Sequence, residues 1–152
     1  NNLEIASSNS YVGGIIGKTY ASKFDNCDVA NCKISGKDKS VGGIVGEFRS
    51  GEINNCHNIN TTVIAAYWCV GGIAGAADVE ETTGVIQNCS NNGSIQGMRT
   101  NGNSNTGGIV GRADGSTVRK CINTGTVKAH IGNGGGICGA ALRRCQYRRL
   151  HQ

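Results

Sequence analysis

The sequence predicts an all-β protein folded as a parallel β-helix, a β-solenoid of about five coils with about 28 residues in each. Three observations lead to this fold class. A glycine-rich hexapeptide recurs five times, its copies are almost evenly spaced, and short apolar stretches of strand length separate them. The copies are VGGIIG, VGGIVG, VGGIAG, TGGIVG and GGGICG, which begin at residues 12, 41, 70, 106 and 134.

The spacing of the copies defines the coil and its insertions. Successive glycine pairs start 29, 29, 36 and 28 residues apart. Relative to a 28-residue unit, the long third interval gains four residues at each of two places, within residues 76–83 and within residues 98–105. Insertions confined to two points are typical of loops that leave a regular repeat. We expect these two third-coil loops to form one lateral protrusion.

Each coil is expected to contain three short strands. The first is the hexapeptide, the second follows the pattern GxIxNC, and the third follows GxVxG or a variant of it. Isoleucine and valine dominate the fixed apolar positions, and each stretch is about five residues long, as strands prefer. Between the second and third strands, Asn or Gly recurs four residues after the cysteine. Both residue types tolerate positive φ, so we predict a left-handed corner at Asn31, Asn60, Gly93 and Gly125.

Stacked coils place equivalent residues in rows. The predicted core rows are Ile15, Ile44, Ile73, Ile109 and Ile137 for the first strand, and Phe24, Ile53, Ile86 and Val118 for the second. Stacked amides are predicted for Asn26, Asn55 and Asn88, and for Asn58, Asn91 and Asn123. A helical repeat is excluded because each glycine of the recurring pairs costs about 1 kcal/mol inside a helix.

Charge is concentrated near the C-terminal end. The chain has a formal net charge of +5, but residues 140–152 hold four Arg and no acid, so the rest is nearly neutral. We therefore expect a β-solenoid repeat domain at residues 1–139 and a basic C-terminal cap or tail at residues 140–152. The body lacks the basic stripes with stacking aromatics that nucleic-acid binding needs. No apolar run approaches the ~18 residues of a membrane span, so neither nucleic acid nor membrane insertion is expected.

The sequence predicts that the first and last coils are incomplete, and that the strands present in one are roughly those missing from the other. Residues 1–6 match a third strand, and residues 134–139 supply a first strand followed by a weak second one. The sequence has no initiator Met and no signal peptide, so we expect a removed leader or a piece cut from a longer array. The alternative is a subunit of an extracellular filament that stacks head to tail.

The repeat resembles the GLUG-motif repeats of bacterial surface proteins, including adhesins and the non-catalytic region of some immunoglobulin A-cleaving metallopeptidases. The stretches VGGIVGEFRSGEINNC (residues 41–56) and TGGIVG with VRKCINTGTV (within residues 106–127) carry this resemblance, with Ile in place of Leu. It extends over about residues 5–139. The resemblance implies an extracellular or cell-surface location and a passive module, and it carries over no catalytic residue.

The eight cysteines are expected to be structural rather than metal-binding. Four of them recur at one repeat position and predict a core ladder of thiols, namely Cys27, Cys56, Cys89 and Cys121. A zinc site would need paired CxxC spacing, which is missing, and no metal or cofactor is expected. The thiols outside the ladder, Cys32, Cys69 and Cys138, are the better candidates for disulfides.

Candidate contact residues for a ligand or partner lie in and beside the third-coil loops. Exposed aromatics at a corner stack on sugar rings or anchor protein partners, and carboxylates in a loop bind cations weakly. These candidates are Tyr67, Trp68, Asp78, Glu80, Glu81, Arg99 and Asn101. The alternative for the aromatic pair is a lid over its corner or a contact with the long 97–106 loop.

We expect no catalysis. His57, His130 and His151 stand apart from any nucleophile motif, and neither Asp nor Glu recurs at a fixed strand position. The sequence therefore favours a non-catalytic surface module that acts as an adhesin stalk or spacer. The second hypothesis is a module that binds a glycan or a host surface protein through the third-coil loops.

Overall fold

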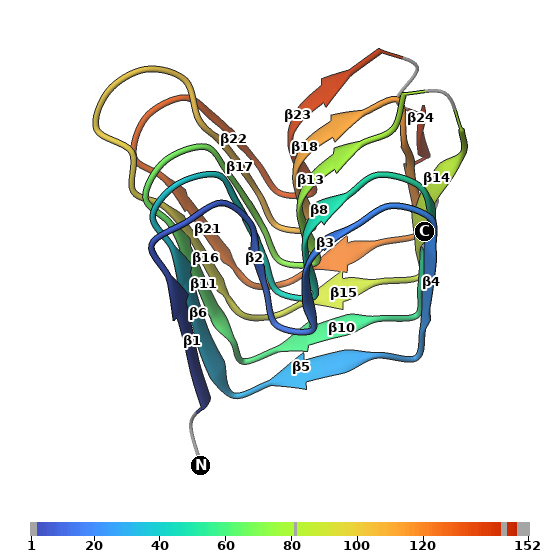
Figure 1. The fold of residues 1–152 in the computed structure, drawn as a ribbon, viewed down its shortest axis with the longest axis horizontal. Helices are drawn as coiled ribbons and strands as arrows, with labels where there is room; N and C mark the ends of the chain where they lie inside the picture. Colours follow the sequence, from blue (N-terminus) through green and yellow to red (C-terminus); the bar gives the residue numbers. More distant parts are fainter. Residues whose placement is uncertain (1–2, 81, 144–145, 149–152) are drawn as a thin grey trace.

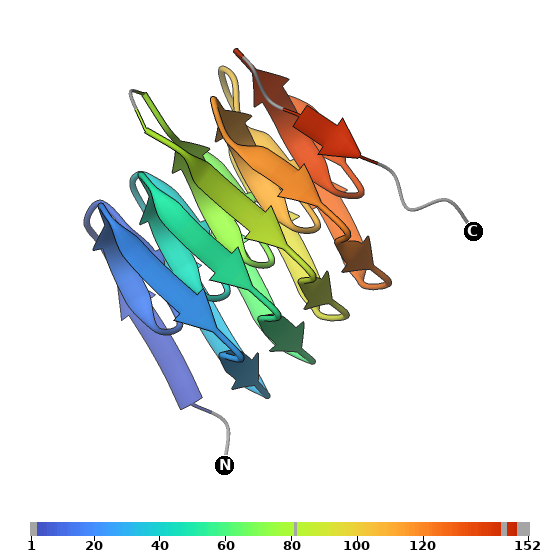
Figure 2. The same cartoon turned by 90° about the vertical axis from the view of Figure 1, so that its right-hand side faces the viewer.

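The protein is an all-β solenoid of about five coils with about 29 residues per turn, which confirms the predicted fold class. The computed structural model describes residues 3–80, 82–143 and 146–148, the last group for the backbone alone. Coils stack from the N-terminal to the C-terminal side with their strands parallel (Figure 2). No helix in the described part of the chain is long and apolar enough to cross a membrane.

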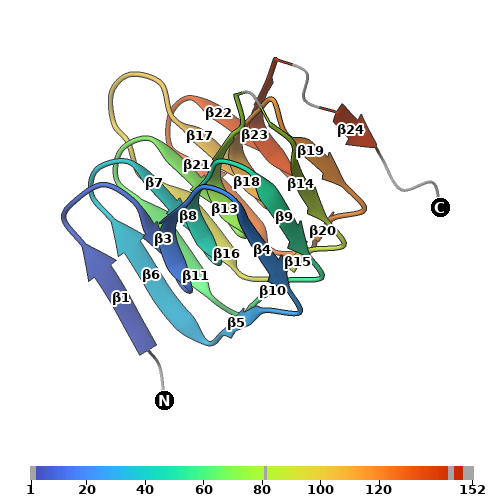
Figure 3. The same ribbon diagram turned by 45° about the vertical axis from the view of Figure 1, so that its right-hand side comes forward.

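Five parallel sheets run along the stack, one strand per coil in each (Figures 1 and 3). Sheet A holds β1 (Leu3–Ser7), β6 (Cys32–Gly36), β11 (Thr62–Ala65), β16 (Ser94–Gly97) and β21 (Thr126–Ala129). Sheet B holds β2 (Val12–Gly13), β7 (Ser40–Gly42), β12 (Cys69–Gly71), β17 (Asn105–Gly107) and β22 (Asn133–Gly135). Sheet C holds β3 (Ile16–Thr19), β8 (Val45–Phe48), β13 (Ala74–Asp78), β18 (Val110–Asp114) and β23 (Cys138–Leu142). Sheet D holds β4 (Ser22–Asp25), β9 (Gly51–Asn54), β14 (Gly84–Gln87), β19 (Thr117–Arg119) and β24 (Gln146–Arg148). Sheet E holds β5 (Asp28–Ala30), β10 (His57–Ile59), β15 (Ser90–Asn91) and β20 (Ile122–Asn123).

A full coil therefore contains five strands, whereas the sequence analysis expected three. The hexapeptide does not form one strand, because the chain bends at its glycine pair and passes from sheet B to sheet C. A further strand, in sheet E, follows the expected second strand. The break between them comes from left-handed residues with φ near +50°, at Asn26, Asn55, Asn88 and Lys120.

The predicted left-handed corner is present in only some coils. Asn31 and Asn60 have φ of 56° and 49°, as expected. Gly93 and Gly125 do not have positive φ. Their backbone N–H groups instead donate to the side-chain oxygens of Asn91 and Asn123, each at 3.1 Å. This local side-chain turn makes the corner without a left-handed residue.

The core is filled by rows of aliphatic side chains, as the repeat predicts. The second-strand row from Phe24 to Val118 is buried throughout. In the hexapeptide row the central members, such as Ile44, are completely buried, whereas Ile15 in the first coil is 47% exposed. An end coil lacks a neighbour on one side, which explains the difference.

A buried amide ladder runs beside the core. The side-chain nitrogen of Asn58 donates to the side-chain oxygen of Asn91 at 2.6 Å, and that of Asn91 donates to Asn123 at 2.8 Å. The second glycine of each pair makes room for it, since a Cβ on Gly72 would lie 2.7 Å from Cγ of Asn91. The outer amide row is less regular: Asn55 donates to Asn26, but Asn88 donates to Asn54.

The bend at the glycine pair makes the cross-section of the coil concave. Figure 1 shows sheets B and C as the two arms of a V, and the connections between them, where the glycine pairs lie in the sequence, form its base. At the base a Cβ on Gly75 would lie 2.6 Å from the backbone nitrogen of Val41 in sheet B, so only glycine permits this approach. The outer faces of sheets B and C therefore face each other, and the region between these two faces is called the groove below.

Strand β23 runs to Leu142, and β24 pairs with β19. Sheets C and D thus continue into the segment that the sequence analysis assigned to a basic cap or tail.

Candidate functional site

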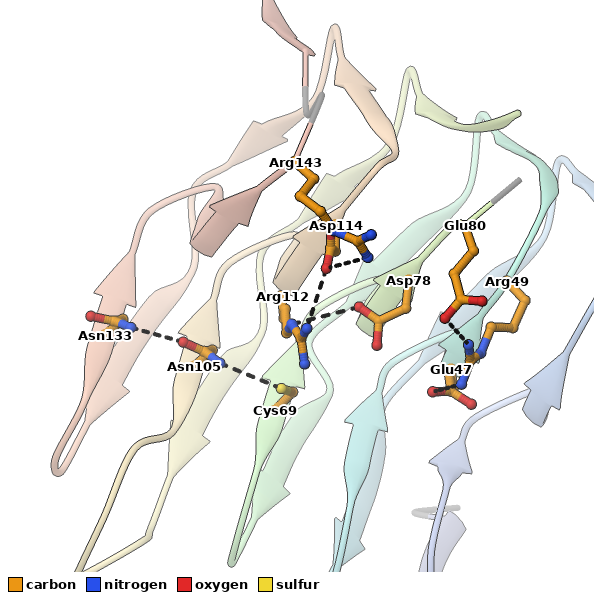
Figure 4. A network of polar contacts seen from close by, with 10 residues as sticks. All are labelled: Glu47, Arg49, Cys69, Asp78, Glu80, Asn105, Arg112, Asp114, Asn133 and Arg143. Carbon is orange, nitrogen blue, oxygen red and sulfur yellow. Dashed lines mark hydrogen bonds and ion pairs between the residues drawn. The ribbon is translucent and has the colours of Figure 1, made fainter. Parts of the chain in front are cut away.

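The groove between sheets B and C contains a cavity of about 250 Å³. Side chains from both walls line it: Tyr11, Lys39, Ser40, Glu47, Trp68, Cys69, Ala76, Asp78 and Arg112. Several of these are ionisable groups held in a largely buried setting, which is typical of a ligand site. Figure 4 shows the polar network that runs along this part of the molecule.

One row of sheet C supplies the groove with charged side chains of both signs. Strand register places Lys18 beside Glu47, Glu47 beside Ala76, and Ala76 beside Arg112. The side chain of Glu47 is only 4% exposed, and its carboxylate lies 3.0 Å from Lys18 Nζ and 3.2 Å from an Arg49 nitrogen. These two cations compensate the buried charge. Contacts with Tyr20 and Glu47 raise the pKa of Lys18 above its ordinary value.

A second set of charges continues the network in the next coils. Arg143 Nε lies 2.9 Å from Asp114 Oδ1, and a nitrogen of Arg112 lies 3.3 Å from Asp114 Oδ2. The Arg143 guanidinium, assisted by Arg112, lowers the pKa of Asp114. The charge of Asp78 is less well compensated, because its nearest cation is Arg112 Nε at 3.7 Å. Burial raises the pKa of Asp78. Of the two carboxylates in the cavity lining, Asp78 is therefore the less well compensated.

Ala76 creates the space. Its register neighbours on either side carry long charged side chains, Glu47 and Arg112, whereas Ala76 ends at Cβ. Cys69 and Ser40, from the opposite wall, also line the cavity and are themselves small. The cavity thus lies where the row has a short side chain between two long charged ones, Glu47 and Arg112.

Aromatic side chains stand at the rim. Trp68 is 47% exposed and lines the cavity, as does Tyr11. Lys18 Nζ lies 4.7 Å from the centre of the Tyr11 ring, and Lys39 Nζ lies 5.5 Å from it. Such cation–π contacts hold Tyr11 against the groove and leave the Trp68 indole as the more exposed ring.

The candidate contact residues do not form one site. The loop after β16 and the loop after β13 lie on opposite sides of the groove (Figure 1), so the expected single protrusion is wrong. The reason is that the two insertions occur at different corners of the coil, from sheet A to B and from sheet C to D.

On the side of the groove formed by sheet B, the Arg99 guanidinium stacks 4.1 Å from the centre of the Tyr67 ring and donates to the backbone oxygen of Asn101. Tyr67 therefore contacts the long loop, as the alternative for the aromatic pair predicts. On the other rim, Glu80 lies 3.7 Å from Arg49. Glu81 and His151 lie outside the described residues.

The four cysteines of the predicted ladder stack in successive coils. Cys56 and Cys89 are buried, Cys27 and Cys121 are half-buried, and all four are free thiols. The thiol of Cys89 lowers the pKa of Cys56 by hydrogen bonding. Cys32 and Cys69, which were better candidates for disulfides, are free thiols in sheets A and B, while Cys138 lies in sheet C.

His57 does not stand apart, contrary to the sequence analysis. Its Nδ1 lies 2.7 Å from the hydroxyl of Ser90, and its Nε2 lies 3.1 Å from the side-chain oxygen of Asn55. Ser90 is the register partner of His57 in the next coil. We interpret the contact as a cross-coil hydrogen bond of sheet E, because the third partner is an amide rather than the carboxylate that orients a catalytic base.

Sequence reasoning missed most of the groove residues, including Lys18, Glu47, Arg112 and Asp114. The signal that could have found one row is its offset: Lys18, Glu47, Ala76 and Arg112 each follow the first glycine of a pair by five residues. Acids alone do not recur at that offset, but three of these four residues are charged. No group of three or more His, Cys, Asp or Glu suited to a metal ion is found among the described residues.

Comparison with known proteins supports the repeat assignment. The family model of the GLUG motif matches residues 8–39, 66–96 and 102–128, which together make up more than half of the chain. No curated protein and no solved structure matches the chain.

Proposed function

Because this chain belongs to the family of proteins built from the GLUG motif, we propose that it is a non-catalytic stalk or spacer of a bacterial surface protein. The motif is typical of extracellular bacterial surface proteins, and we place this module outside the cell on that ground. We expect it to work without a cofactor.

One observation carries the proposal: the register between coils is unbroken. Strand pairs connect each coil to the next in sheets A, B, C and D from the first coil onward, and the insertions only lengthen corners. Each coil contacts only its neighbours, so length can change by whole coils without rebuilding a site. This property suits a part whose task is to set a distance.

The register also supplies the experiment. Ser40 pairs with Cys69, so removing the 29 residues 40–68 deletes one coil, and duplicating them adds one. Each step should change the length of the rod by about 4.8 Å, as measured by small-angle X-ray scattering. The array is then placed between a cell-surface anchor and an antibody epitope. Antibody access should rise with coil number and should not change in an Arg112→Ala variant. Access that is independent of coil number would overturn the spacer role.

The two other roles considered from the sequence have less support. Binding through both third-coil loops as a single surface is not favoured, because those loops lie on opposite rims. Head-to-tail assembly of copies stays a prediction, and sedimentation at two concentrations tests it.

A further inference from the structure

We propose that the cavity beside Ala76 binds one uncharged sugar residue, with Trp68 as its aromatic platform and Asp78 and Arg112 as its polar contacts. This activity is additional to a spacer role and does not depend on it. The site lies in the groove between sheets B and C, away from the tips of the two third-coil loops.

Size limits the ligand. The cavity of about 250 Å³ is smaller than the roughly 300–1,000 Å³ typical of sites for drug-sized ligands. It suits one ring with its substituents rather than an extended molecule buried along its whole length.

Charge decides against an ionic ligand. The lining carries two acids, Glu47 and Asp78, and two bases, Lys39 and Arg112. An anion placed there meets the carboxylates, and a cation meets the ammonium and guanidinium groups. A neutral molecule with many hydroxyl groups avoids both penalties, because each hydroxyl donates one hydrogen bond and accepts others.

Unsatisfied polar atoms identify two side chains of the cavity lining that lack a hydrogen-bond partner. Asp78 Oδ1 and Arg112 Nε are both buried, and neither makes a hydrogen bond within the described part of the chain. They lie 3.7 Å apart, too far for a direct hydrogen bond. Buried groups of this kind cost free energy until a partner arrives. A sugar hydroxyl that donates to the Asp78 carboxylate and accepts from the Arg112 guanidinium satisfies both side chains.

The rim supplies the apolar contact that a pyranose ring needs. Trp68 exposes 47% of its surface while it lines the cavity. An indole offers a large flat face together with one N–H donor, a combination suited to a ring with an apolar face and a polar edge. The neighbouring Tyr67 stacks with Arg99 at 4.1 Å and does not line the cavity, so Trp68 is the ring at this corner that a ligand in the cavity can contact.

Trp68 is the single tryptophan of the chain, so its fluorescence reports directly on the site. The intact protein is titrated with the methyl glycosides of glucose, galactose, mannose and N-acetylglucosamine, and with glucuronate and glucosamine as charged counterparts. We expect a saturable change with at least one neutral glycoside and a Kd near 1 mM, which corresponds to about −4 kcal/mol. The charged counterparts should bind at least tenfold more weakly.

Three variants locate the response. Ala76→Leu fills the cavity and Asp78→Asn removes its carboxylate, and each should weaken binding at least tenfold in isothermal calorimetry. The matched control is Tyr20→Ala, an exposed aromatic outside the cavity lining, which should leave affinity unchanged. Circular dichroism checks that each variant is folded, and Asp78→Asn keeps the test valid if Ala76→Leu disturbs the sheet.

The outcomes are decisive in either direction. No saturable response to any neutral glycoside up to about 100 mM overturns the proposal, since that concentration exceeds the expected Kd a hundredfold. Tighter binding of glucuronate or glucosamine overturns the charge argument. Binding that survives both Ala76→Leu and Asp78→Asn places the ligand elsewhere and removes the site.

Discussion

Replacing Asn91 with alanine should test the buried amide ladder. Asn91 accepts from the Asn58 side chain at 2.6 Å and from the Gly93 backbone N–H at 3.1 Å. Truncation leaves both buried donors without a partner. Each such loss costs about 1–3 kcal/mol, so we expect Asn91→Ala to lower the free energy of unfolding by about 4 kcal/mol. That is a large share of the roughly 5–15 kcal/mol that stabilises a typical domain.

The matched control is Asn54→Ala. Asn54 also sits in an amide row, donating to Asp25 at 2.9 Å and accepting from Asn88 at 2.8 Å, but it is half-exposed, so water replaces its partners. We expect a loss of about 0.5 kcal/mol at that position. Urea unfolding followed by circular dichroism measures both, with the slope of the transition checked for equality. Equal losses at the two positions would refute the reasoning that burial makes the ladder structural.

Three further predictions concern stability. Glu47→Gln should cost about 2 kcal/mol, because it leaves partly exposed cations beside a buried amide, whereas Glu4→Gln in an exposed pair should cost less than about 0.5 kcal/mol in the same urea assay. Asp114, whose pKa is lowered by Arg143, contributes stability above the unfolded-state pKa of about 3.9 that is lost as the pH falls through its folded-state value. Asp114→Asn should therefore be less stable at pH 7 and show a flatter stability profile between about pH 5 and 2, and an unchanged acid limb would contradict this. Ile73→Ala, in the buried row, should lower the unfolding midpoint by an amount equivalent to about 2–5 kcal/mol, and Ile15→Ala, in the exposed end coil, by less than about 1 kcal/mol.

The repeat arithmetic predicted the solenoid because its causes are local and periodic. Aliphatic residues such as Ile53 recur at one position of every coil, and parallel stacking buries all of them by the same rule. The amide ladder through Asn58 could be predicted for the same reason. A residue that recurs at the same position of every coil also recurs in the same environment. Once one such position is correctly predicted to be buried, the equivalent positions of the other coils can be predicted too.

The groove could not be predicted because it depends on where the chain bends. The pattern VGGIVG is equally compatible with one strand and with two strands that meet at Gly42 and Gly43. The approach of sheet C to sheet B across the glycines involves backbone atoms from adjacent coils, and no local preference specifies it. Without knowledge of the bend, the sequence pattern predicts that Glu47 and Asp78 are charged side chains on the outer surface. Once the two sheets face each other, the same side chains are buried and paired.

In this groove the glycines at the base set the distance between the walls, and other residues set the chemistry of the lining. The base fixes the distance between the walls through backbone atoms, as at Gly75 and Val41, while the side chain at the Ala76 position differs from coil to coil. The chemistry of the groove can therefore be rewritten one coil at a time without disturbing the hydrophobic interior. Each added coil therefore adds one more lining position along the axis, and a change at that position is felt by the charged partners in the adjacent coils.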